Sequence, residues 1–339
     1  MKVIPIRLLL ILAVSVFILA GYGCSEEELI KPGQEREPVW EKIQGIGSSA
    51  ISRMKFDSQE NLYVLKSSNR KVLFRSPDYG NTWAVTGTVS IDTTYTGNIS
   101  SFCFIGDDML VGTREGKIFI SSDNGNVFTL VDSIGRPQLK DIRHIECAPD
   151  GNIYAAVYGQ AIYRTEHPDS SWQMLGTSIE NKDFTSMEID SDGCIYMGCW
   201  AGDSYKSCDN AETWQALNKI EDHELATITS LKRGDRDLLM CGFTEGFAIY
   251  RGDSTWVVKN AGFPGGNSDI RCLGVTSGDK IYAGTIYDGV FRATWDVWEW
   301  APVNDGLPLT ELKVTSMVID SEERVYIGTV DDGIWRSIW

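Results

Sequence analysis

Residues 270–300 read IRCLGVTSGDKIYAGTIYDGVFRATWDVWEW, and the pattern of this stretch decides the fold. It contains three short runs rich in Val, Ile, Tyr and Phe, at 270–275, 281–285 and 290–293. Turn residues separate these runs: Ser-Gly-Asp-Lys follows the first and Tyr-Asp-Gly follows the second. Short apolar runs divided by Gly and Asp turns are typical of antiparallel β-strands. Trp300 then opens a fourth run.

The same unit recurs along the chain with a regular period. The aromatic residues that open the fourth run stand 42 to 45 residues apart, at Trp40, Trp83, Phe128, Trp172, Trp214, Trp256 and Trp300. A period of this length is typical of a four-stranded propeller blade. The second run occurs seven times, at 62–64, 109–112, 153–156, 195–198, 238–241, 281–284 and 325–328.

The two ends of the chain complement each other. The chain ends at Trp339, directly after the third run of the seventh unit, whereas the run at 38–43 precedes the first complete unit. We therefore predict an all-β fold, a seven-bladed β-propeller over residues 38–339 with four-stranded antiparallel blades. The N-terminal strand closes the last blade, which removes the open seam of the ring. The length of 339 residues alone would have suggested two domains.

Composition excludes several classes of protein. Hydrophobic residues make up 42% and charged residues 23% of the chain, which excludes a disordered protein. The formal net charge of −16 argues against nucleic-acid binding. Three histidines leave little for a His-based zinc site or a His-driven hydrolase, so we expect no metal and no cofactor.

The N-terminus has the features of an export signal. Lys2 and Arg7 precede an apolar stretch of 13 residues from Leu8 to Ala20, too short to span a bilayer. The small residues Gly21 and Gly23 flank Tyr22 and are followed by Cys24, which resembles a bacterial lipobox. We predict a lipoprotein signal peptide at 1–23 and a lipid on Cys24. We expect residues 24–37 to form an acidic flexible tether and the protein to be an outer-membrane lipoprotein of the cell envelope, either exposed at the cell surface or facing the periplasm. A cleaved signal followed by an incidental Cys is the alternative.

A second repeated pattern lies directly before three of the aromatic residues. It reads SPDYGNTW at 76–83, SSDNGNVF at 121–128 and SCDNAETW at 207–214. An Asp in a hairpin accepts backbone N–H bonds, and Gly supplies a positive φ. We expect these residues to be structural: Ser76, Asp78, Gly80, Trp83, Ser121, Asp123, Gly125, Phe128, Ser207, Asp209 and Trp214.

This pattern resembles the Asp-box, or BNR repeat, of a propeller superfamily. The superfamily includes sialidases, sortilin-type receptors, xyloglucan hydrolases and a lipoprotein photosystem II assembly factor. The fold does not select among these functions. The resemblance implies that ligands bind the face opposite the Asp-box turns, where the loops between second and third strands and between blades emerge.

Those loops carry several aromatic and charged residues. Exposed aromatic rings beside acids stack on sugars or anchor a protein partner. The alternative for the aromatic residues is packing between neighbouring blades. The candidate ligand-face residues are Tyr95, Arg114, Glu115, Tyr158, Trp200, Phe243, Glu245, Tyr287, Asp288, Asp331 and Asp332.

Three functions remain open at this stage. The favoured function is a non-catalytic lipoprotein that binds a glycan or a partner protein, with a membrane contact through Cys24. The second is a sialidase-like glycoside hydrolase, for which Asp288 with Asp331 or Asp332 would supply two carboxylates. However, the chain has no Arg-Ile-Pro motif, and its arginines cannot be grouped from sequence, so catalytic residues stay unassigned. The third is a scaffold for assembly of an envelope complex.

Seven cysteines remain besides Cys24, and an odd set cannot pair completely. Cys103 and Cys147 hold equivalent positions in adjacent blades, and we expect them to be small buried hydrophobic residues. Cys199 and Cys241 lie near the ends of adjacent second strands and are the candidates for a disulfide.

Overall fold

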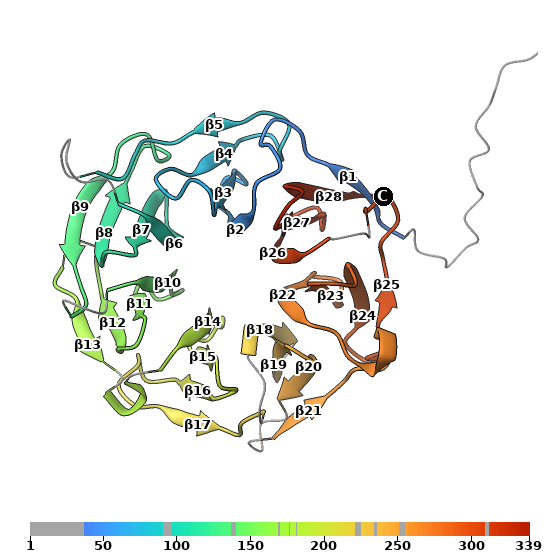
Figure 1. Ribbon diagram of the computed structural model, residues 1–339. Helices are drawn as coiled ribbons and strands as arrows, with labels where there is room; N and C mark the ends of the chain where they lie inside the picture. The colour runs from blue at the N-terminus through green and yellow to red at the C-terminus, as the bar shows by residue number, and fades with distance from the viewer. Residues whose placement is uncertain are drawn as a thin grey trace, which may run out of the picture. The chain divides into compact units, whose positions relative to one another are not determined.

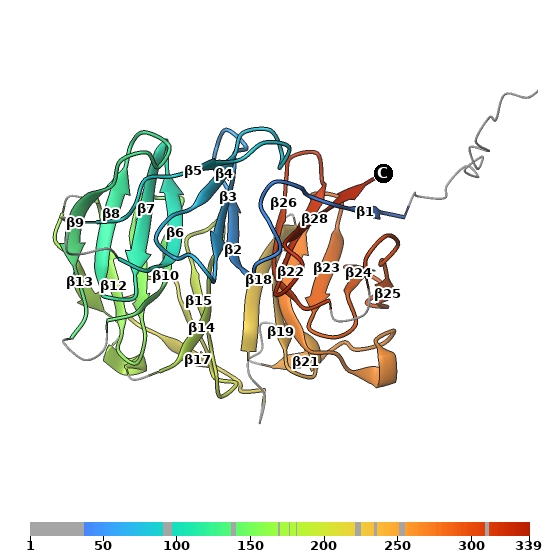
Figure 2. The same cartoon turned by 45° about the horizontal axis from the view of Figure 1, so that its top comes forward.

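Seven four-stranded antiparallel sheets surround a central axis in the computed structural model, as Figure 1 shows. The tilted view in Figure 2 shows the strands of each sheet running between the two faces of the ring. The prediction of a seven-bladed propeller is confirmed. The structure describes residues 37–90, 97–136, 140–168, 170–175, 177–180, 182–220, 225–233, 236–250, 255–308 and 312–339. The predicted signal peptide, Cys24 and most of the tether therefore lie outside the described residues.

Each blade begins with a strand at the axis and ends with a strand at the rim. Blades one to three comprise β2 (Ile51–Phe56), β3 (Leu62–Lys66), β4 (Phe74–Ser76), β5 (Ala84–Val85), β6 (Ile99–Ile105), β7 (Asp108–Thr113), β8 (Lys117–Ser121), β9 (Thr129–Ser133), β10 (Ile142–Cys147), β11 (Ile153–Val157), β12 (Ile162–Thr165) and β13 (Gln173–Leu175). Blades four and five comprise β14 (Phe184–Ile189), β15 (Ile195–Cys199), β16 (Ser204–Ser207), β17 (Gln215–Leu217), β18 (Leu225–Arg233), β19 (Arg236–Phe243), β20 (Gly246–Tyr250) and β21 (Trp256–Val258).

Blades six and seven complete the ring. They comprise β22 (Ile270–Val275), β23 (Lys280–Thr285), β24 (Val290–Thr294), β25 (Ala301–Pro302), β26 (Val314–Ile319), β27 (Val325–Thr329), β28 (Ile334–Ile338) and β1 (Val39–Lys42). Two short 3₁₀ turns, η1 (Thr177–Ile179) and η2 (Pro264–Gly266), lie in loops between blades. No helix of the described residues is long and apolar enough to cross a membrane.

The N-terminal strand closes blade seven. Strand β1 pairs antiparallel with β28, and Trp40 lies opposite Ser337. The Trp40 side chain is 3% exposed, and its indole N–H donates to the Val303 carbonyl over 2.6 Å. Ion pairs from β1, one of them between Glu41 and Arg336, add to this contact. Closure therefore rests on a buried aromatic ring, a strand ladder and paired charges.

The core consists of seven apolar layers, one between each pair of neighbouring blades. Second strands such as β3 and β27 are buried along their whole length. A glycine in β27 lets blade one approach closely, since a Cβ on Gly328 would lie 2.6 Å from a methyl carbon of Ile51. Blade packing thus explains the glycine near the end of the second strand in five blades, at Gly112, Gly198, Gly242, Gly284 and Gly328.

The three predicted turns share one hydrogen-bond pattern, and we refer to 76–83, 121–128 and 207–214 as the Ser-x-Asp turns. In the first, Ser76 Oγ donates to Asp78 over 2.9 Å and accepts the Gly80 N–H over 2.7 Å. Asp78 also accepts the N–H of residue 82 over 2.7 Å. The other two turns repeat these bonds. In blade four Ala211 holds a positive φ of 66°, where the other two turns have glycine.

The cysteine pairing differs from the sequence-based expectation. Disulfides join Cys103 to Cys147 and Cys194 to Cys208. Cys199, Cys241 and Cys272 are free and buried. The expected Cys199–Cys241 pair is therefore wrong, and Cys103 and Cys147 are not free hydrophobic residues. Equivalent positions on first strands of adjacent blades bring Cys103 and Cys147 to a Cα–Cα distance of 6.1 Å, which suits a disulfide.

Candidate functional site at the mouth of the central channel

The two faces of the ring carry different loops. The turn face carries the Ser-x-Asp turns, and the mouth face carries the loops between second and third strands and between blades. First strands start at the mouth face because they follow an inter-blade loop. Side chains near the start of a first strand therefore lie at the mouth of the central channel.

A β-bulge near the start of every first strand shapes this mouth. The register shifts at the same point in all seven blades, directly after the first strand residue. A bulge leaves one residue unpaired and redirects its side chain. The described side chains at this position are Ser52, Ser100, Arg143, Thr185, Arg271 and Thr315.

The side chains at the bulge position fall into two groups, hydroxyl groups that bond to a neighbouring blade and arginines that border the mouth. The Ser100 hydroxyl donates to the Ile142 carbonyl over 2.7 Å, and Thr315 donates to the Ile51 carbonyl over 2.8 Å. These bonds join neighbouring blades. In blades three and six an arginine takes this place instead, so a long cationic side chain stands at the mouth.

These arginines border a hollow of about 410 Å³ at the mouth. Arg53, Arg143 and Arg271 come from blades one, three and six, and the Trp200 indole forms part of the wall. Arg143 pairs with Asp141 over 2.9 Å, and Arg271 pairs with Asp269 over 2.7 Å. Trp200 is 61% exposed. Guanidinium groups beside an open aromatic ring suit a ligand with carboxylates.

Arg53 is held by main-chain carbonyls. Its Nε donates to the Ser100 carbonyl over 2.8 Å and one Nη donates to the Arg143 carbonyl over 2.5 Å, so it joins blades one, two and three. Burial is the main reason that the pKa of Arg53 is lowered. The charges of Glu146 and Asp141 oppose the shift, whereas those of Arg70 and Arg143 add to it. The mouth is thus electropositive although the chain as a whole is acidic.

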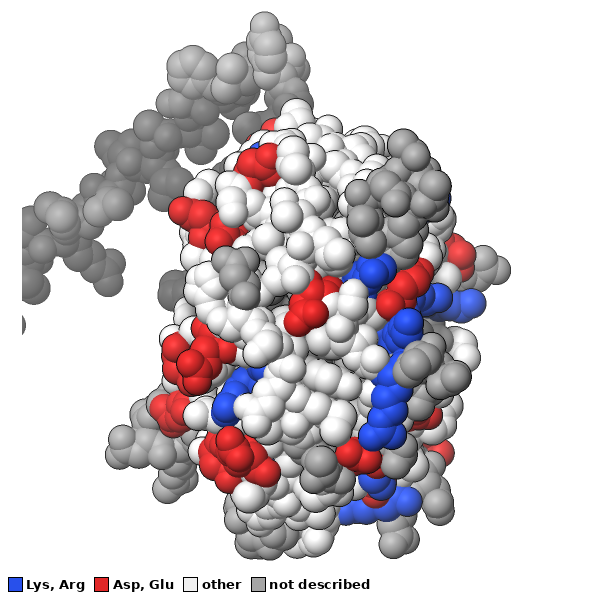
Figure 3. Space-filling model, turned by 90° about the vertical axis from the view of Figure 1, so that its left-hand side faces the viewer, with Lys and Arg blue, Asp and Glu red and all other residues white. Residues whose placement is uncertain are grey.

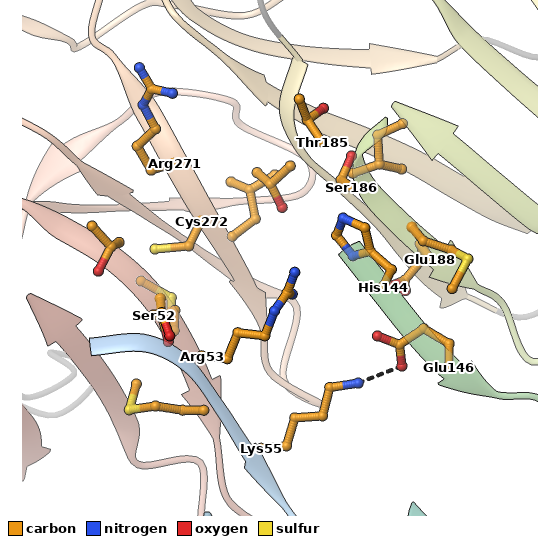
Figure 4. A pocket seen from close by; sticks show the side chains of 18 residues that line it. Ser52, Arg53, Lys55, His144, Glu146, Thr185, Ser186, Glu188, Arg271 and Cys272 are labelled. Atoms are coloured by element: carbon orange, nitrogen blue, oxygen red, sulfur yellow. Dashed lines mark hydrogen bonds and ion pairs between the residues drawn. The ribbon is translucent and has the colours of Figure 1, made fainter. Parts of the chain in front are cut away.

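The hollow continues into a channel cavity of about 370 Å³, drawn in Figure 4. The Lys55 ammonium forms an ion pair with Glu146 across the inner edges of blades one and three. His144 lies above this pair and is 6% exposed. Burial, followed by the nearby Arg53 and Lys55 charges, holds the pKa of His144 well below its usual value, so its ring is neutral at pH 7.

Charge is unevenly distributed between the two faces of the ring, which lie at the left and right edges of Figure 3. In the side view of Figure 3, Lys and Arg gather toward one edge, whereas Asp and Glu predominate toward the other. Mouth-face loops of blades one to three carry Arg70, Arg114 and Arg136. Burial lowers the pKa of Arg70, and the charge of Arg114 lowers it further. The basic group therefore extends outward from the mouth.

The candidate ligand-face residues occupy different environments. Trp200 and Tyr287 are the most open, at 61% and 71% exposed. Arg114, Glu245 and Asp331 are also exposed, while Tyr95 lies outside the described residues. Phe243 is 2% exposed and packs in the layer between blades four and five, so its predicted place on the ligand face is wrong.

Several of these candidates support loop structure. Glu115 accepts the N–H and side-chain amide of Asn98, and Asp288 accepts the Ser268 hydroxyl. Asp332 pairs with Lys42 and accepts the Trp335 indole N–H over 3.1 Å. The Arg143 guanidinium lies over the Tyr158 ring, with its Cζ 4.5 Å from the centre of that ring. Of the whole set, Trp200 is the one that lines the mouth hollow.

The sequence analysis did not assign Arg53, Arg143, Arg271 or His144 to the ligand face. One signal was present: Asp-Ile-Arg occurs at 141–143 and again at 269–271, at the same place in two repeats. The described residues contain no group of three or more His, Cys, Asp or Glu placed to hold a metal ion.

Comparison with known proteins identifies structures of the same fold, but it does not assign the chain to a family. No protein-family model and no curated protein matches the chain. Among solved structures, YCF48 bound to D1 peptide is similar with a TM-score of 0.70 and 15% identity, over 89% of this chain and 96% of that one. YCF48 from Cyanidioschyzon merolae is similar with a TM-score of 0.67 and 13% identity, over 88% and 98%.

Two further similar structures are those of other proteins. An inactive variant of virginiamycin B lyase from Staphylococcus aureus, crystallised with quinupristin, has a TM-score of 0.71 and 11% identity, over 89% of this chain and all of that one (100%). The extracellular domain of a protein from B. thetaiotaomicron has a TM-score of 0.67 and 16% identity, over 89% of this chain and 40% of that one. Identities this low show a shared seven-bladed fold alone.

Proposed function

We propose that this protein is a non-catalytic lipoprotein of the bacterial cell envelope that binds a partner through the mouth face of an Asp-box propeller. The observation that carries the proposal is the convergence of Arg53, Arg143 and Arg271 with the exposed Trp200 around one hollow. These cations stand in a chain with a net charge of −16. The electropositive mouth therefore favours a ligand with acidic groups.

A protein segment with Asp or Glu side chains is the partner we favour. Guanidinium groups bind carboxylates through paired hydrogen bonds, and Trp200 offers a flat apolar surface for a neighbouring side chain. A similar propeller, YCF48, is known in complex with a peptide, which supports a protein partner. A glycan with acidic sugars would use the same groups, and a scaffold for an envelope complex would use the same face.

A sialidase-like hydrolase is the second candidate function. The gathering of three arginines favours it, since such enzymes hold a carboxylate sugar. It also needs two carboxylates beside the bound ligand. Asp288 and Asp332 are engaged by Ser268 and Lys42 in their own loops, and neither lines the mouth hollow. We therefore place binding before catalysis.

Binding is tested by titrating fluorescent peptides rich in Asp and Glu, and matched amide peptides, into the purified protein. We expect the acidic peptides to bind, with an affinity that falls as salt rises. Arg143→Gln with Arg271→Gln should reduce affinity by at least about a hundredfold, because charge-assisted hydrogen bonds contribute about 1.5–3 kcal/mol each. The charge-matched control is Lys206→Gln with Lys280→Gln on strands β16 and β23, outside the hollow.

Two results would contradict the proposal. Equal loss of affinity in both double variants would show that the mouth is not the site. Cleavage of any member of a sialoside and polysaccharide panel would favour the hydrolase.

The anchor is tested separately. We propose that residues 1–23 are removed, that Cys24 is lipidated, and that residues 24–37 tether the propeller to the outer membrane. Cys24→Ser should then release the protein from the membrane fraction, whereas Cys208→Ser should leave it there. Membrane retention of the Cys24→Ser protein would overturn the anchor.

A further inference from the structure

One backbone hydrogen bond recurs in the loops at the mouth and gives six of them an equivalent residue. In each, the residue directly after the second strand donates its N–H to the carbonyl of the residue directly before the first strand, over 2.8–3.0 Å. We call this the loop-anchor position, and it is held by Ser67, Arg114, Tyr158, Trp200, Ile286 and Val330. Because the same bond fixes the backbone in each blade, the side chains at this position can be compared directly.

The side chains at the loop-anchor position divide the mouth into two halves. In blades one to three each of them carries a polar group, and Arg53, Arg70 and Arg143 lie in the same three blades. In blades four, six and seven the loop-anchor residues are apolar: Trp200, Ile286 and Val330. The mouth therefore has a cationic half and an apolar half.

The two halves meet at the mouth hollow. The charged side chains that line it are Arg53, Arg143 and Arg271, and none of its described lining residues is acidic. Trp200 and Ile286 form its apolar wall. The Trp200 side chain is 61% exposed, so most of its apolar surface is open to water, and covering that surface is favourable. A ligand in the hollow thus contacts cations and apolar side chains together.

We infer that the hollow selects an extended protein segment in which an acidic residue stands two positions before a large apolar residue such as Leu or Phe. This inference rests on the proposed function and specifies its partner. Side chains at positions i and i+2 of an extended segment lie on one side, about 7 Å apart. The acid binds the arginines through charge-assisted hydrogen bonds, and the apolar side chain covers Trp200 and Ile286. Trp200 is then the residue that determines specificity.

The test compares two fluorescent peptides of equal charge in titrations of the purified protein. Their sequences are Gly-Ser-Glu-Glu-Ser-Leu-Ser-Gly and Gly-Ser-Glu-Glu-Ser-Gly-Ser-Gly, so they differ only in the Leu side chain. The Leu peptide should bind about tenfold more tightly, because it buries apolar surface that the Gly peptide lacks. Salt screens the charges and not the apolar contact, so raising salt to about 0.5 M should weaken both peptides and preserve their ratio.

Variants of the exposed aromatic residues locate the preference. Trp200→Ala should bring the two peptides within about twofold of each other, and Trp200→Phe should restore most of the difference. Because Trp200 is 61% exposed, its replacement leaves the fold intact. The matched control is Tyr287→Ala, since Tyr287 lies on the same face, is 71% exposed and does not line the hollow. This control should keep the tenfold preference.

Three outcomes would overturn the inference: equal affinity for the two peptides, a preference that survives Trp200→Ala, or an equal loss of preference in Tyr287→Ala. Tighter binding of oligogalacturonate than of the Leu peptide would also overturn it and assign the hollow to an acidic glycan. If the Gly peptide binds and Leu adds nothing, the inference alone fails. If neither peptide binds, the proposed function fails and the inference fails with it.

Discussion

The turn face and the mouth face of this propeller differ in how their polar groups are satisfied. On the turn face, Asp78 accepts bonds from its own hairpin, and Ser76 completes the same network. At the mouth, Arg53 keeps donors that no described carboxylate accepts, since its hydrogen bonds go to the carbonyls of Ser100 and Arg143. Both faces are rich in charge, but the carboxylates of the Ser-x-Asp turns accept bonds within their own hairpins, whereas the hydrogen bonds of Arg53 go to main-chain carbonyls of two other blades.

This difference separates structural charge from charge available to a ligand. A carboxylate that accepts backbone N–H bonds stabilises its turn and has little capacity for another partner. A partly buried cation that lacks a counterion is costly and is retained where a ligand supplies the anion. Substitutions on the turn face should therefore change stability, and those at the mouth should change binding.

The largest effect is expected at the closure of blade seven. Trp40→Ala should reduce the free energy of unfolding by about 3–5 kcal/mol, because it removes a ring that is 3% exposed. Trp339→Ala, at a site 42% exposed, is the matched control and should change stability by less than about 1 kcal/mol. Urea unfolding measures both. If the two variants are equally stable, strand β1 does not close the ring.

A smaller effect is expected in the first Ser-x-Asp turn. Ser76→Ala should destabilise the protein by about 1–3 kcal/mol, because the buried Gly80 N–H loses its acceptor. The exposed Ser58 in the β2–β3 turn provides the control, and Ser58→Ala should unfold at the wild-type urea concentration. Peptide binding should persist in both variants. Loss of binding in Ser76→Ala at full stability would break the division between the two faces.

The smallest effect is expected in the pH dependence of stability, to which the aspartates of the Ser-x-Asp turns contribute. Hydrogen bonds from Thr82, Val127 and Thr213 are the leading causes that lower the pKa of Asp78, Asp123 and Asp209. Because the folded pKa values lie below the unfolded value of 3.8, their contribution is present above that pH and is lost as pH falls through the folded values.

Urea unfolding between pH 5 and pH 2.5 measures this slope. A variant with all three aspartates changed to Asn should show a shallower decline in stability than wild type below about pH 4. The control is Ser58→Ala in the exposed β2–β3 turn, which removes no carboxylate and should keep the wild-type slope. Identical slopes in all proteins would show that the turns do not stabilise the aspartate charge.

The sequence predicted the features that depend on local pattern. Blade number, strand order and closure follow from the aromatic period and from the unpartnered strand at 38–43. The three Ser-x-Asp turns follow from hairpin chemistry within eight residues. Phe243 illustrates the limit of the pattern: it sits in a predicted loop region, yet the structure places it at the end of β19 and inside the core.

The candidate site could not be predicted in the same way. Asp288 and Asp332 were predicted to be ligand-face residues because they lie in loops. In the structure, however, Asp288 accepts a hydrogen bond from Ser268, and Asp332 forms an ion pair with Lys42. Position in a strand concealed Arg143 and Arg271, which a bulge turns toward the axis. Burial and hydrogen-bond satisfaction decide these roles, and neither can be read from residue type.

The sequence by itself determined a ring of seven similar blades, because each blade repeats the same short strands and turns within one period. Only the tertiary structure decided which side chains share the channel. Arg53, Arg143 and Arg271 lie in three different blades, far apart along the chain, and they meet because ring closure brings the first strand of every blade to one axis. In blades three and six the bulge then places Arg143 and Arg271 at the mouth, where charge from distant repeats is summed.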